Sequence, residues 1–359
     1  LMSVMSAHDF GWIGLDGALT RIDATISSME RMARFRGHFF NWYDTRNLAV
    51  LPAPYVSAVD SGNLAGLLIA LSAGLRAWAE DAPSVRRRRT AGLGDALANL
   101  RLELDALGEG RRSLRDLRRA LYGSIAGMQD VRDQMGGRPV SDPLAASQLI
   151  TRAAEIVRLA AELDAATQGE AAEALAWARL LEQDTRSVMT PAPEGREAIE
   201  LFMLRTRLLA ERARMLAFGM DFSLFVQTDK MLLSIGYRPL DDQLDESSYD
   251  LLASEARLTS FLAIAKGDIR KEHWTRLGRP FATVGHQGAL LSWSGCMFEY
   301  LMPPLLLKER QGGILNHSNM MAVQVQMDWG RSHGLPWGIS ESAFNARDRQ
   351  MNSQYYAFG

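Results

Sequence analysis

Apolar residues recur at helical spacing along most of the chain. Two leucine stripes with three- and four-residue intervals are Leu97, Leu100, Leu104 and Leu107, and then Leu114, Leu117 and Leu121. Strand-like alternation is scarce, and its best example is the short run from Met231 to Tyr237. The pattern therefore predicts an all-α protein.

Composition divides the chain into three parts. Residues 1–80 are rich in aromatic and small side chains, residues 81–218 are dominated by Ala, Leu, Arg and Glu, and residues 219–359 return to Gly, Trp, Tyr and acidic residues. Breaks in the middle part fall at 136–139 and 191–193. We expect 81–218 to form long antiparallel helices without a catalytic group, and the outer parts to carry the chemistry.

Bulk properties narrow the class of protein. The chain has 359 residues, of which 47% are hydrophobic, so it can bury a large core as a soluble protein. A net charge of −2 indicates no nucleic-acid partner. The longest apolar stretch, from Leu64 to Leu75, is shorter than the roughly 20 residues that span a bilayer. The ends at Leu1 and Gly359 do not resemble natural termini, which predicts a fragment of a longer protein.

Several kinds of site are excluded by missing motifs. Cys296 is the single cysteine, so neither a disulfide framework nor a cysteine-based metal site can form within the chain. The sequence has no phosphate-binding glycine loop, no dinucleotide fingerprint, no zinc spacing and no GxSxG nucleophile elbow. We therefore expect no metal and no cofactor. What remains is a chemistry of carboxylates beside aromatic rings.

Four clusters combine aromatic side chains with acidic, amide or hydroxyl groups. Sugars need this mixture, because their flat faces stack on Trp and Tyr while their hydroxyls need polar partners. The predicted substrate-binding residues in these clusters are Trp42, Tyr43, Asp44, Asp60, Asn63, Trp293, Ser294, Glu299, Tyr300, Trp337 and Ser340. Each cluster taken alone can equally reflect aromatic packing at a loop–helix junction. Four clusters in one chain favour a cleft that binds a glycan.

Glu255 is the most informative acidic residue. A helix would place it on one face with Leu251, Leu258 and Leu262. A carboxyl held against apolar surface has a raised pKa, which is what a general acid requires. Glu299, in the third aromatic cluster, is either a ligand of sugar hydroxyls or a third acid candidate.

A structural role stays open for two of the acidic candidates. Glu255 can instead pair with a core arginine, either Arg257 or Arg238. Glu341 follows residues 336–338, a Pro-Trp-Gly sequence that predicts a sharp turn before a helix. Its carboxylate is then either a partner of the helix N-terminus or a rigidly held nucleophile.

At these residues the sequence resembles a known family. The stretches GHFFNWYDT, VDSGNLAG, YDLLASEARLTSFLAIAKGD, HWTRLGR, SWSGCMFEYLMP and PWGISESAFNARD are together similar to the central, glycoamylase-like domain of cyclic β-1,2-glucan synthases. The similar stretches cover roughly residues 8–80 and 219–359, and 81–218 looks like a variable helical insertion. One departure is Cys296, which stands where a small hydroxyl residue is expected.

The resemblance implies a fold and a reaction. It implies an incomplete (α/α)6 toroid formed by residues 1–80 and 219–359, with 81–218 as a helical insertion. Its activity would be anomer-retaining transglycosylation, in which linear β-1,2-glucan is cleaved, held on an enzyme carboxylate and transferred to its own non-reducing end. Carried over by motif, Glu255 in LLASEARL is the acid/base and Glu341 in WGISESA is the nucleophile.

The resemblance also implies a setting for this chain. Members of the family are inner-membrane proteins, and the matching domain faces the cytoplasm between a glycosyltransferase domain and a phosphorylase-like domain. Two other functions fit the same residues: an endo-β-1,2-glucanase, which passes the sugar to water, and a non-catalytic module that binds glucan. Product analysis separates the three, because they give rings, new reducing ends or no reaction.

Overall fold

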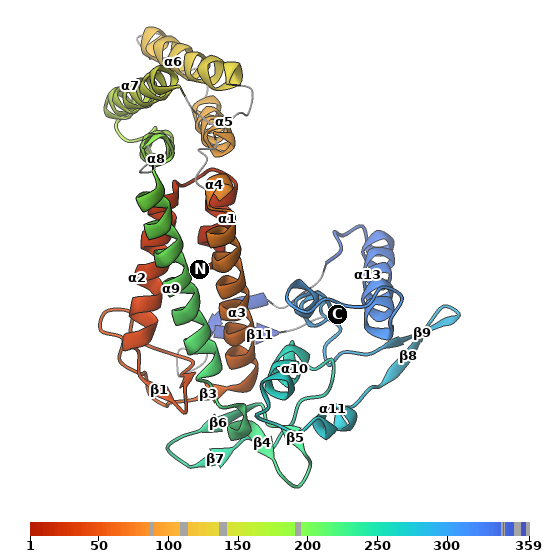
Figure 1. Ribbon diagram of the computed structural model, residues 1–359. Coiled ribbons are helices and arrows are strands. Elements are labelled where there is room, and N and C mark those ends of the chain that lie inside the picture. Colours follow the sequence, from red (N-terminus) through yellow and green to blue (C-terminus); the bar gives the residue numbers. More distant parts are fainter. Residues whose placement is uncertain are drawn as a thin grey trace. The chain divides into compact units, whose positions relative to one another are not determined.

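The computed structural model describes residues 1–85, 90–107, 114–135, 142–190, 195–338, 340, 342–347 and 353–356. Most of these residues are helical, as the periodicity predicts. Contacts between residues separate the chain into two compact units (Figure 1). Unit 1 comprises 1–28 and 73–210, and unit 2 comprises 29–72 and 211–359. The division into 1–80, 81–218 and 219–359 was drawn from composition and stays a prediction.

Unit 1 consists of helices. They are α1 (Met2–Asp9), the first part of α2 (Leu15–Arg31), the last part of α3 (Ala58–Glu80), α4 (Ala82–Val85), α5 (Ala91–Ala106), α6 (Arg115–Gln134), α7 (Pro143–Thr167), α8 (Ala172–Met189) and the first part of α9 (Arg196–Phe218). Helix α7 packs against α6 and α8, and α5 packs against α8 (Figure 1). The two predicted breaks in this region, 136–139 and 191–193, lie outside the described residues.

The leucine stripes explain why these helices associate. Leu97, Leu100 and Leu104 are fully buried in one apolar cluster with Leu121, and Leu107 packs at its edge. Burying one such side chain contributes about 1.5–3 kcal/mol. Local signals fix the helix ends: the Asp142 carboxylate accepts a hydrogen bond from the Leu144 amide at 2.9 Å and so caps the start of α7.

Unit 2 mixes short helices with small sheets. Its helices, besides the remaining parts of α2, α3 and α9, are α10 (Ala256–Lys266), α11 (Glu272–Arg276), α12 (Met297–Leu301), α13 (Ile314–His333) and the 3₁₀ turns η2 (Phe222–Phe225) and η3 (Pro303–Leu305). Its strands are β1 (Arg34–Phe35), β2 (His38–Phe39), β3 (Val56–Ser57), β4 (Val226–Gln227), β5 (Leu232–Leu233), β6 (Gly236–Arg238), β7 (Gln243–Leu244), β8 (Phe281–Val284), β9 (Gln287–Leu290), β10 (Ser342–Arg347) and β11 (Ser353–Tyr356).

The strands form antiparallel pairs and one three-stranded sheet. Strand β6 lies between β3 and β7, with Val56 opposite Tyr237 and Tyr237 opposite Leu244. The other strands pair as β1–β2, β4–β5, β8–β9 and β10–β11. The run from Met231 to Tyr237, the best strand candidate in the sequence, supplies β5 and the start of β6, which belong to different sheets, so that prediction is confirmed in part.

Two small residues let α10 lie close to α3. A Cβ atom on Gly62 would stand 2.8 Å from the Thr259 Cα, and one on Gly66 would meet Leu258 at 3.2 Å. Glycine at both positions therefore permits an approach that a larger residue would block. Thr259 adds a hydrogen bond from its hydroxyl to the Ala58 carbonyl at 3.3 Å. This crossing brings the first turns of α3 beside the N-terminus of α10.

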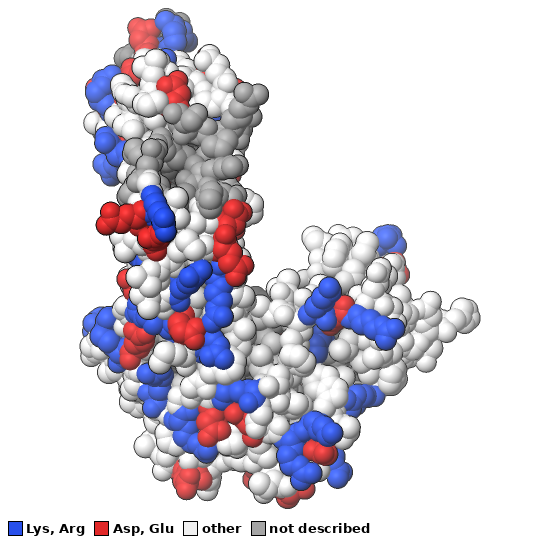
Figure 2. Space-filling view, in the orientation of Figure 1, with Lys and Arg blue, Asp and Glu red and all other residues white. Residues whose placement is uncertain are grey.

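Helix α3 is the one helix among the described residues that is long and apolar enough to cross a membrane by length and composition. Core helices of soluble proteins pass the same test, and 56% of the apolar window of α3 is buried within the protein. Charged side chains of both signs are interspersed over the face in Figure 2. The location predicted from the resemblance, an inner-membrane protein with this part facing the cytoplasm, stays a prediction.

Candidate active site

Glu255 lies at the N-cap of α10, and its side chain is buried, with 4% of its surface exposed. The expectation that it sits within a helix is wrong, because residues 251–255 form turns and α10 begins at Ala256. Of the three leucines predicted to surround it, Leu251 and Leu258 are buried and Leu262 is partly exposed. The turn before the helix, rather than a helical face, aims this carboxylate.

Burial raises the pKa of the Glu255 carboxyl, and the negative charge of Asp60 adds to the effect. Hydrogen bonds from Ser254 and Asn63 favour the ionised form and work in the opposite direction. The raised pKa predicted from the sequence is thus confirmed, with desolvation as its main cause. A carboxyl in this state can hold a proton that it later gives up.

Asn63 on α3 contacts Glu255 directly. Its Nδ2 donates to Glu255 Oε1, and its Oδ1 is buried. An amide can donate to an ionised carboxylate or, turned over, accept from a protonated one. The close crossing of α3 and α10 at Gly62 makes this contact between residues 192 positions apart.

A second carboxylate organises the turn that carries Glu255. Glu299 on α12 is 2% exposed, and its Oε1 accepts from the Ser254 amide at 3.0 Å. Its Oε2 accepts from the amide and the hydroxyl of Ser294, at 3.0 and 2.7 Å. Ser254 has φ 49°, a left-handed conformation that residues with a side chain rarely adopt, and its hydroxyl bonds Glu255. Glu299 thus holds a strained turn beside the candidate acid.

An aromatic pair lies beside these carboxylates. The Tyr249 ring packs against Trp293 with centroids 5.8 Å apart, and the Trp293 indole N–H donates to Asp250 Oδ2 at 3.4 Å. Burial raises the pKa of the Tyr249 hydroxyl, and the charges of Glu255 and Asp60 raise it further. Half of the Trp293 surface stays exposed and can stack on a ligand.

The segment that contains Trp337 is tied to the Trp293 loop by α13. Gln326 of α13 is 5% exposed, and its Nε2 donates to the Gly295 carbonyl at 3.2 Å. Its Oε1 accepts from the Gly338 amide at 3.1 Å. Trp293 and Trp337, 44 positions apart in the sequence, thus belong to segments that one side chain holds together.

The predicted aromatic ligands are exposed rather than packed in the core. Trp42, Trp293 and Trp337 are 68%, 50% and 48% exposed. Full burial in the core is therefore excluded for these three tryptophans, whereas their contact with a substrate stays a prediction. Asn41, next to Trp42, donates to Asp60 Oδ2 at 3.4 Å and so links the first two clusters.

Other predicted ligands have their polar groups engaged within the protein. The Tyr43 hydroxyl donates to the Ala33 carbonyl at 2.6 Å, and Asp44 pairs with Arg46 at 2.6 Å. Tyr300 is 5% exposed and donates its hydroxyl to the Leu290 carbonyl at 3.0 Å. Substrate contacts by these three residues stay a prediction, and the structure gives each of them a role in holding its own loop.

The arginines proposed as alternative partners of Glu255 pair elsewhere. Arg257 Nη2 donates to Glu309 Oε1 at 2.8 Å, and both residues are largely buried. Arg238 lies 3.5 Å from Asp245. Glu309 and Asp245 therefore pair with these two arginines, which argues against an arginine as the partner of Glu255.

Glu341 lies outside the described residues, so its predicted position opposite Glu255 stays a prediction. The expectation that a helix follows it is wrong. Residues 342–347 form β10, which pairs with β11 so that Ser342 lies opposite Tyr356. The expected helix is thus replaced by a strand, and the role of Glu341 itself stays a prediction. Ser340 is partly exposed.

A comparison with known proteins agrees with the motifs. Over its whole length the chain is 48% identical to part of the cyclic beta-(1,2)-glucan synthase NdvB of Rhizobium meliloti (strain 1021). The chain is homologous to one segment of that synthase. The resemblance to cyclic β-1,2-glucan synthases stated from the motifs is thereby confirmed. The chain covers 13% of the length of this relative. No family model matches the chain.

The site also contains residues that the sequence did not single out. Ser254, Tyr249, Asp250 and Gln326 each orient a predicted residue or its loop. The sequence placed the first three beside Glu255 in one motif, which was a usable signal. Gln326 carries no such signal, because it lies in an ordinary helical run two positions after another glutamine.

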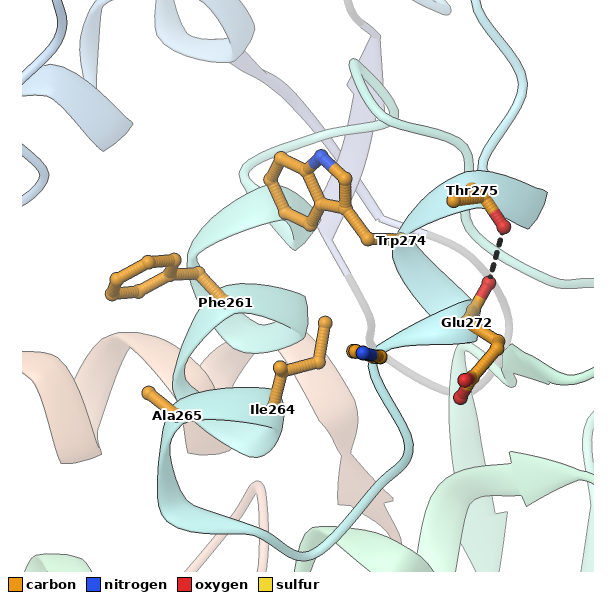
Figure 3. Close-up of a pocket in the computed structure, with 7 residues that line it drawn as sticks. Phe261, Ile264, Ala265, Glu272, Trp274 and Thr275 are labelled. Atoms are coloured by element: carbon orange, nitrogen blue, oxygen red, sulfur yellow. Dashed lines mark hydrogen bonds between the residues drawn. The ribbon is translucent and has the colours of Figure 1, made fainter.

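One pocket lies apart from these residues. It has a volume of about 450 Å³ and is lined by α10 and α11 through Phe261, Ile264, Ala265, Lys271, Glu272, Trp274 and Thr275 (Figure 3). The Thr275 hydroxyl donates to the Glu272 carbonyl at 2.8 Å. Its apolar lining includes none of the predicted site residues, so we do not assign it to the candidate active site.

In the described part of the chain, no three His, Cys, Asp or Glu side chains gather into a group that could hold a metal ion. The acidic residues near Glu255 instead contact amide, hydroxyl and aromatic groups. This donor set suits the hydroxyls and flat faces of a sugar.

Proposed function

We propose that this chain is the ring-closing part of a cyclic β-1,2-glucan synthase and that it carries out anomer-retaining transglycosylation. The observation that carries the proposal is Glu255, a buried carboxyl whose raised pKa suits an acid catalyst, in a chain homologous to such a synthase. The substrate is linear β-1,2-glucan, and the product is a ring. No cofactor takes part.

In the proposed reaction two carboxyl groups act on one glycosidic bond. The Glu341 carboxylate attacks C1 of a glucose unit, the C1–O2 bond breaks, and the protonated Glu255 gives its proton to the departing O2. The O2 hydroxyl of the non-reducing end then attacks C1, passes its proton to Glu255 and releases Glu341. No water is consumed, so the ring has one linkage for every glucose unit.

The proposed substrate contacts are chosen from the exposure of the tryptophan rings and from the polar interactions of residues near Glu255. We propose that Trp42, Trp293 and Trp337 stack on glucose faces, because these rings are exposed and Trp293 is oriented by Asp250. Asp60 and Asn63 would bind hydroxyls near Glu255, since each interacts with it. Glu299 holds the Ser254 turn and the Trp293 loop instead of meeting the substrate, since both its oxygens accept from protein groups.

The architecture proposed for this site is the incomplete (α/α)6 toroid implied by the family resemblance. In such a fold, loops at one end of successive helices converge, so clusters distant in sequence can line one mouth. The crossing of α3 and α10 and the bonds of Gln326 support this view, because they join residues from three separate clusters. Flanking glycosyltransferase and phosphorylase-like domains of the parent protein would supply and trim the glucan.

Product analysis tests the proposal. Incubation with linear β-1,2-glucan should give products lighter by one water than the linear chain of equal length and resistant to reducing-end labelling. New reducing ends would identify an endo-β-1,2-glucanase instead, and glucan binding without reaction would identify a binding module. The Glu341→Gln variant should form neither rings nor hydrolysis products, because no glycosyl-enzyme can form.

Azide rescue assigns the two roles. With an aryl glycoside of the glucan, a variant lacking the acid/base still forms the glycosyl-enzyme, and azide then gives a β-glycosyl azide. A variant lacking the nucleophile gives the α-glycosyl azide by a single displacement. We expect the β product from the Glu255 variant and the α product from the Glu341 variant. The reverse result would exchange the two roles but keep the pair.

A further inference from the structure

Gln326 bonds the peptides of two turns that carry exposed tryptophans. One turn ends in Gly295, with φ 73°, and the other in Gly338, with φ 97°, so both glycines have left-handed backbones. The amide of Gln326 donates to the first peptide and accepts from the second. Because Gln326 is 5% exposed, water competes little for these bonds.

Packing of α13 supports the same junction. A Cβ atom on Gly330 would lie 2.8 Å from the Leu335 carbonyl oxygen and 3.3 Å from the Trp337 amide nitrogen. The helix therefore passes close beside the backbone of residues 335–337. The Leu335 amide also donates to the Gly330 carbonyl at 2.9 Å. The chain thus returns along the end of its own helix before it reaches Gly338.

These contacts complete a chain of hydrogen bonds that begins at Glu255. Ser254 bonds Glu255, Glu299 joins Ser254 to Ser294, and Gln326 joins the neighbouring Gly295 to Gly338. Three residues beyond Gly338 the sequence reaches Glu341. A displacement on the order of 1 Å between reacting groups can cost about 10²-fold in rate.

We propose that Gln326 is a positioning residue that sets the Trp337 segment relative to the Trp293 loop, which Glu299 joins to the turn that carries Glu255. The catalytic consequence of this inference rests on the proposed function. The two hydrogen bonds by which Gln326 joins Gly295 to Gly338, here called the clamp, do not depend on it. Glutamine suits this position because its amide group can donate to a carbonyl and accept from an N–H at the same time. An apolar residue would leave both peptide groups without this partner.

Replacement by leucine tests the clamp. In Gln326→Leu, hydrogen–deuterium exchange of the peptide that contains the Gly338 amide should rise about tenfold or more, because the bond protecting that amide is gone. Peptides from α5 to α8 should exchange as in the wild type. Gln324→Leu is the matched control, since Gln324 is exposed on the same helix, and its exchange pattern should not change. Unaltered exchange at Gly338 in Gln326→Leu would overturn the proposal.

Kinetics test the consequence for catalysis. The Gln326→Leu variant should lower kcat of ring formation about 10- to 100-fold while KM changes less than about threefold, since geometry rather than affinity is lost. If the wild type forms no rings, the proposed function fails and the exchange experiment still decides the clamp. If exchange rises but kcat stays normal, the clamp exists without positioning the reaction and the proposal fails.

A conservative variant keeps the test independent of folding defects. In Gln326→Glu, a protonated carboxyl can donate and accept as the amide does, and burial raises the pKa of an introduced carboxyl. Its activity relative to wild type should therefore be highest at low pH and fall as the carboxyl ionises with rising pH. A relative activity that does not change with pH, in a folded variant, would contradict a clamp that depends on this donor.

Discussion

The two units bury different things. Unit 1 buries mainly leucine and alanine at regular helical intervals, as in the stripe from Leu93 to Leu104, together with a few polar groups such as Asp184. Unit 2 buries charged and polar groups, among them Glu255, Arg257 and Glu299, and joins them by hydrogen bonds between segments distant in sequence. Polar burial costs free energy unless every group finds a partner. Unit 1 therefore has the composition of a structural scaffold. In unit 2, hydrogen bonds between buried polar groups set the geometry of the candidate site.

This contrast predicts its largest effect at Glu255. The Glu255→Gln variant should lose about 10²–10⁴-fold in ring formation, because the amide can neither give nor take the proton. Its thermal stability should be equal to or higher than that of the wild type, since a desolvated carboxyl has been removed. Ring formation followed by mass spectrometry, beside a thermal melt, checks both. The control is Glu173→Gln, an exposed glutamate of unit 1, and a comparable loss there would refute the assignment.

Truncation of a buried side chain in unit 1 should lower stability and leave activity unchanged, the reverse of the result expected for Glu255→Gln. Leu100→Ala removes part of a fully buried side chain from the leucine stripe and should cost about 2–5 kcal/mol in unfolding free energy. Ring formation per folded molecule should be unchanged below the melting temperature, because unit 1 supplies no group to the candidate site. Chemical denaturation combined with activity at low temperature measures the two effects. A selective loss of activity without loss of stability would erase the distinction between the units.

Glu299 should show an intermediate result. Glu299→Gln turns an NH₂ group toward donors that the carboxylate now accepts from, at a cost of about 1–3 kcal/mol. Activity should fall together with stability, since the Ser254 turn and the Trp293 loop both lose an anchor. Denaturation and kinetics on the same preparation test this coupling. Loss of activity with full stability would instead indicate that Glu299 meets the substrate.

The smallest effect concerns pH. His38 in unit 2 is fully buried, and burial lowers its pKa to about 4. The unfolded chain therefore binds a proton more readily, so stability is lost as pH falls from the unfolded value near 6.5 toward 4. Between pH 7 and 5 the loss should be about 2 kcal/mol. His38→Gln keeps a donor for the Asp221 carbonyl, and its stability should fall less over this range; equal slopes in urea melts would argue against the titration.

The sequence predicted the buried core of unit 1 more completely than it predicted the local structure of unit 2. Helical periodicity located the buried leucines of unit 1, because apolar burial leaves a repeating trace. The acidic and aromatic motifs singled out Asn63, Trp293 and Glu299 because their residue types match sugar chemistry, and the apolar neighbours of Glu255 singled out that residue; their roles in a site stay predictions. The predictions of a helix around Glu255 and of a helix after Glu341 were wrong. Turns and the β10–β11 pairing form there instead, and both depend on partners that are distant in the sequence. Gln326 escaped notice because only its tertiary bonds distinguish it from Gln324.

The stereochemistry of the first product tests the central claim most directly. A retaining transglycosylase acting on linear β-1,2-glucan replaces each broken β linkage with a new β linkage, so the ring contains β linkages throughout. Proton NMR recorded before mutarotation should accordingly show closed rings with β anomeric signals and no α reducing-end signal beyond that of the substrate, whose own reducing end leaves on the released fragment. An inverting enzyme would instead release reducing ends that begin as the α anomer. Early α signals without rings would contradict the account of Glu255 and Glu341 as a retaining pair.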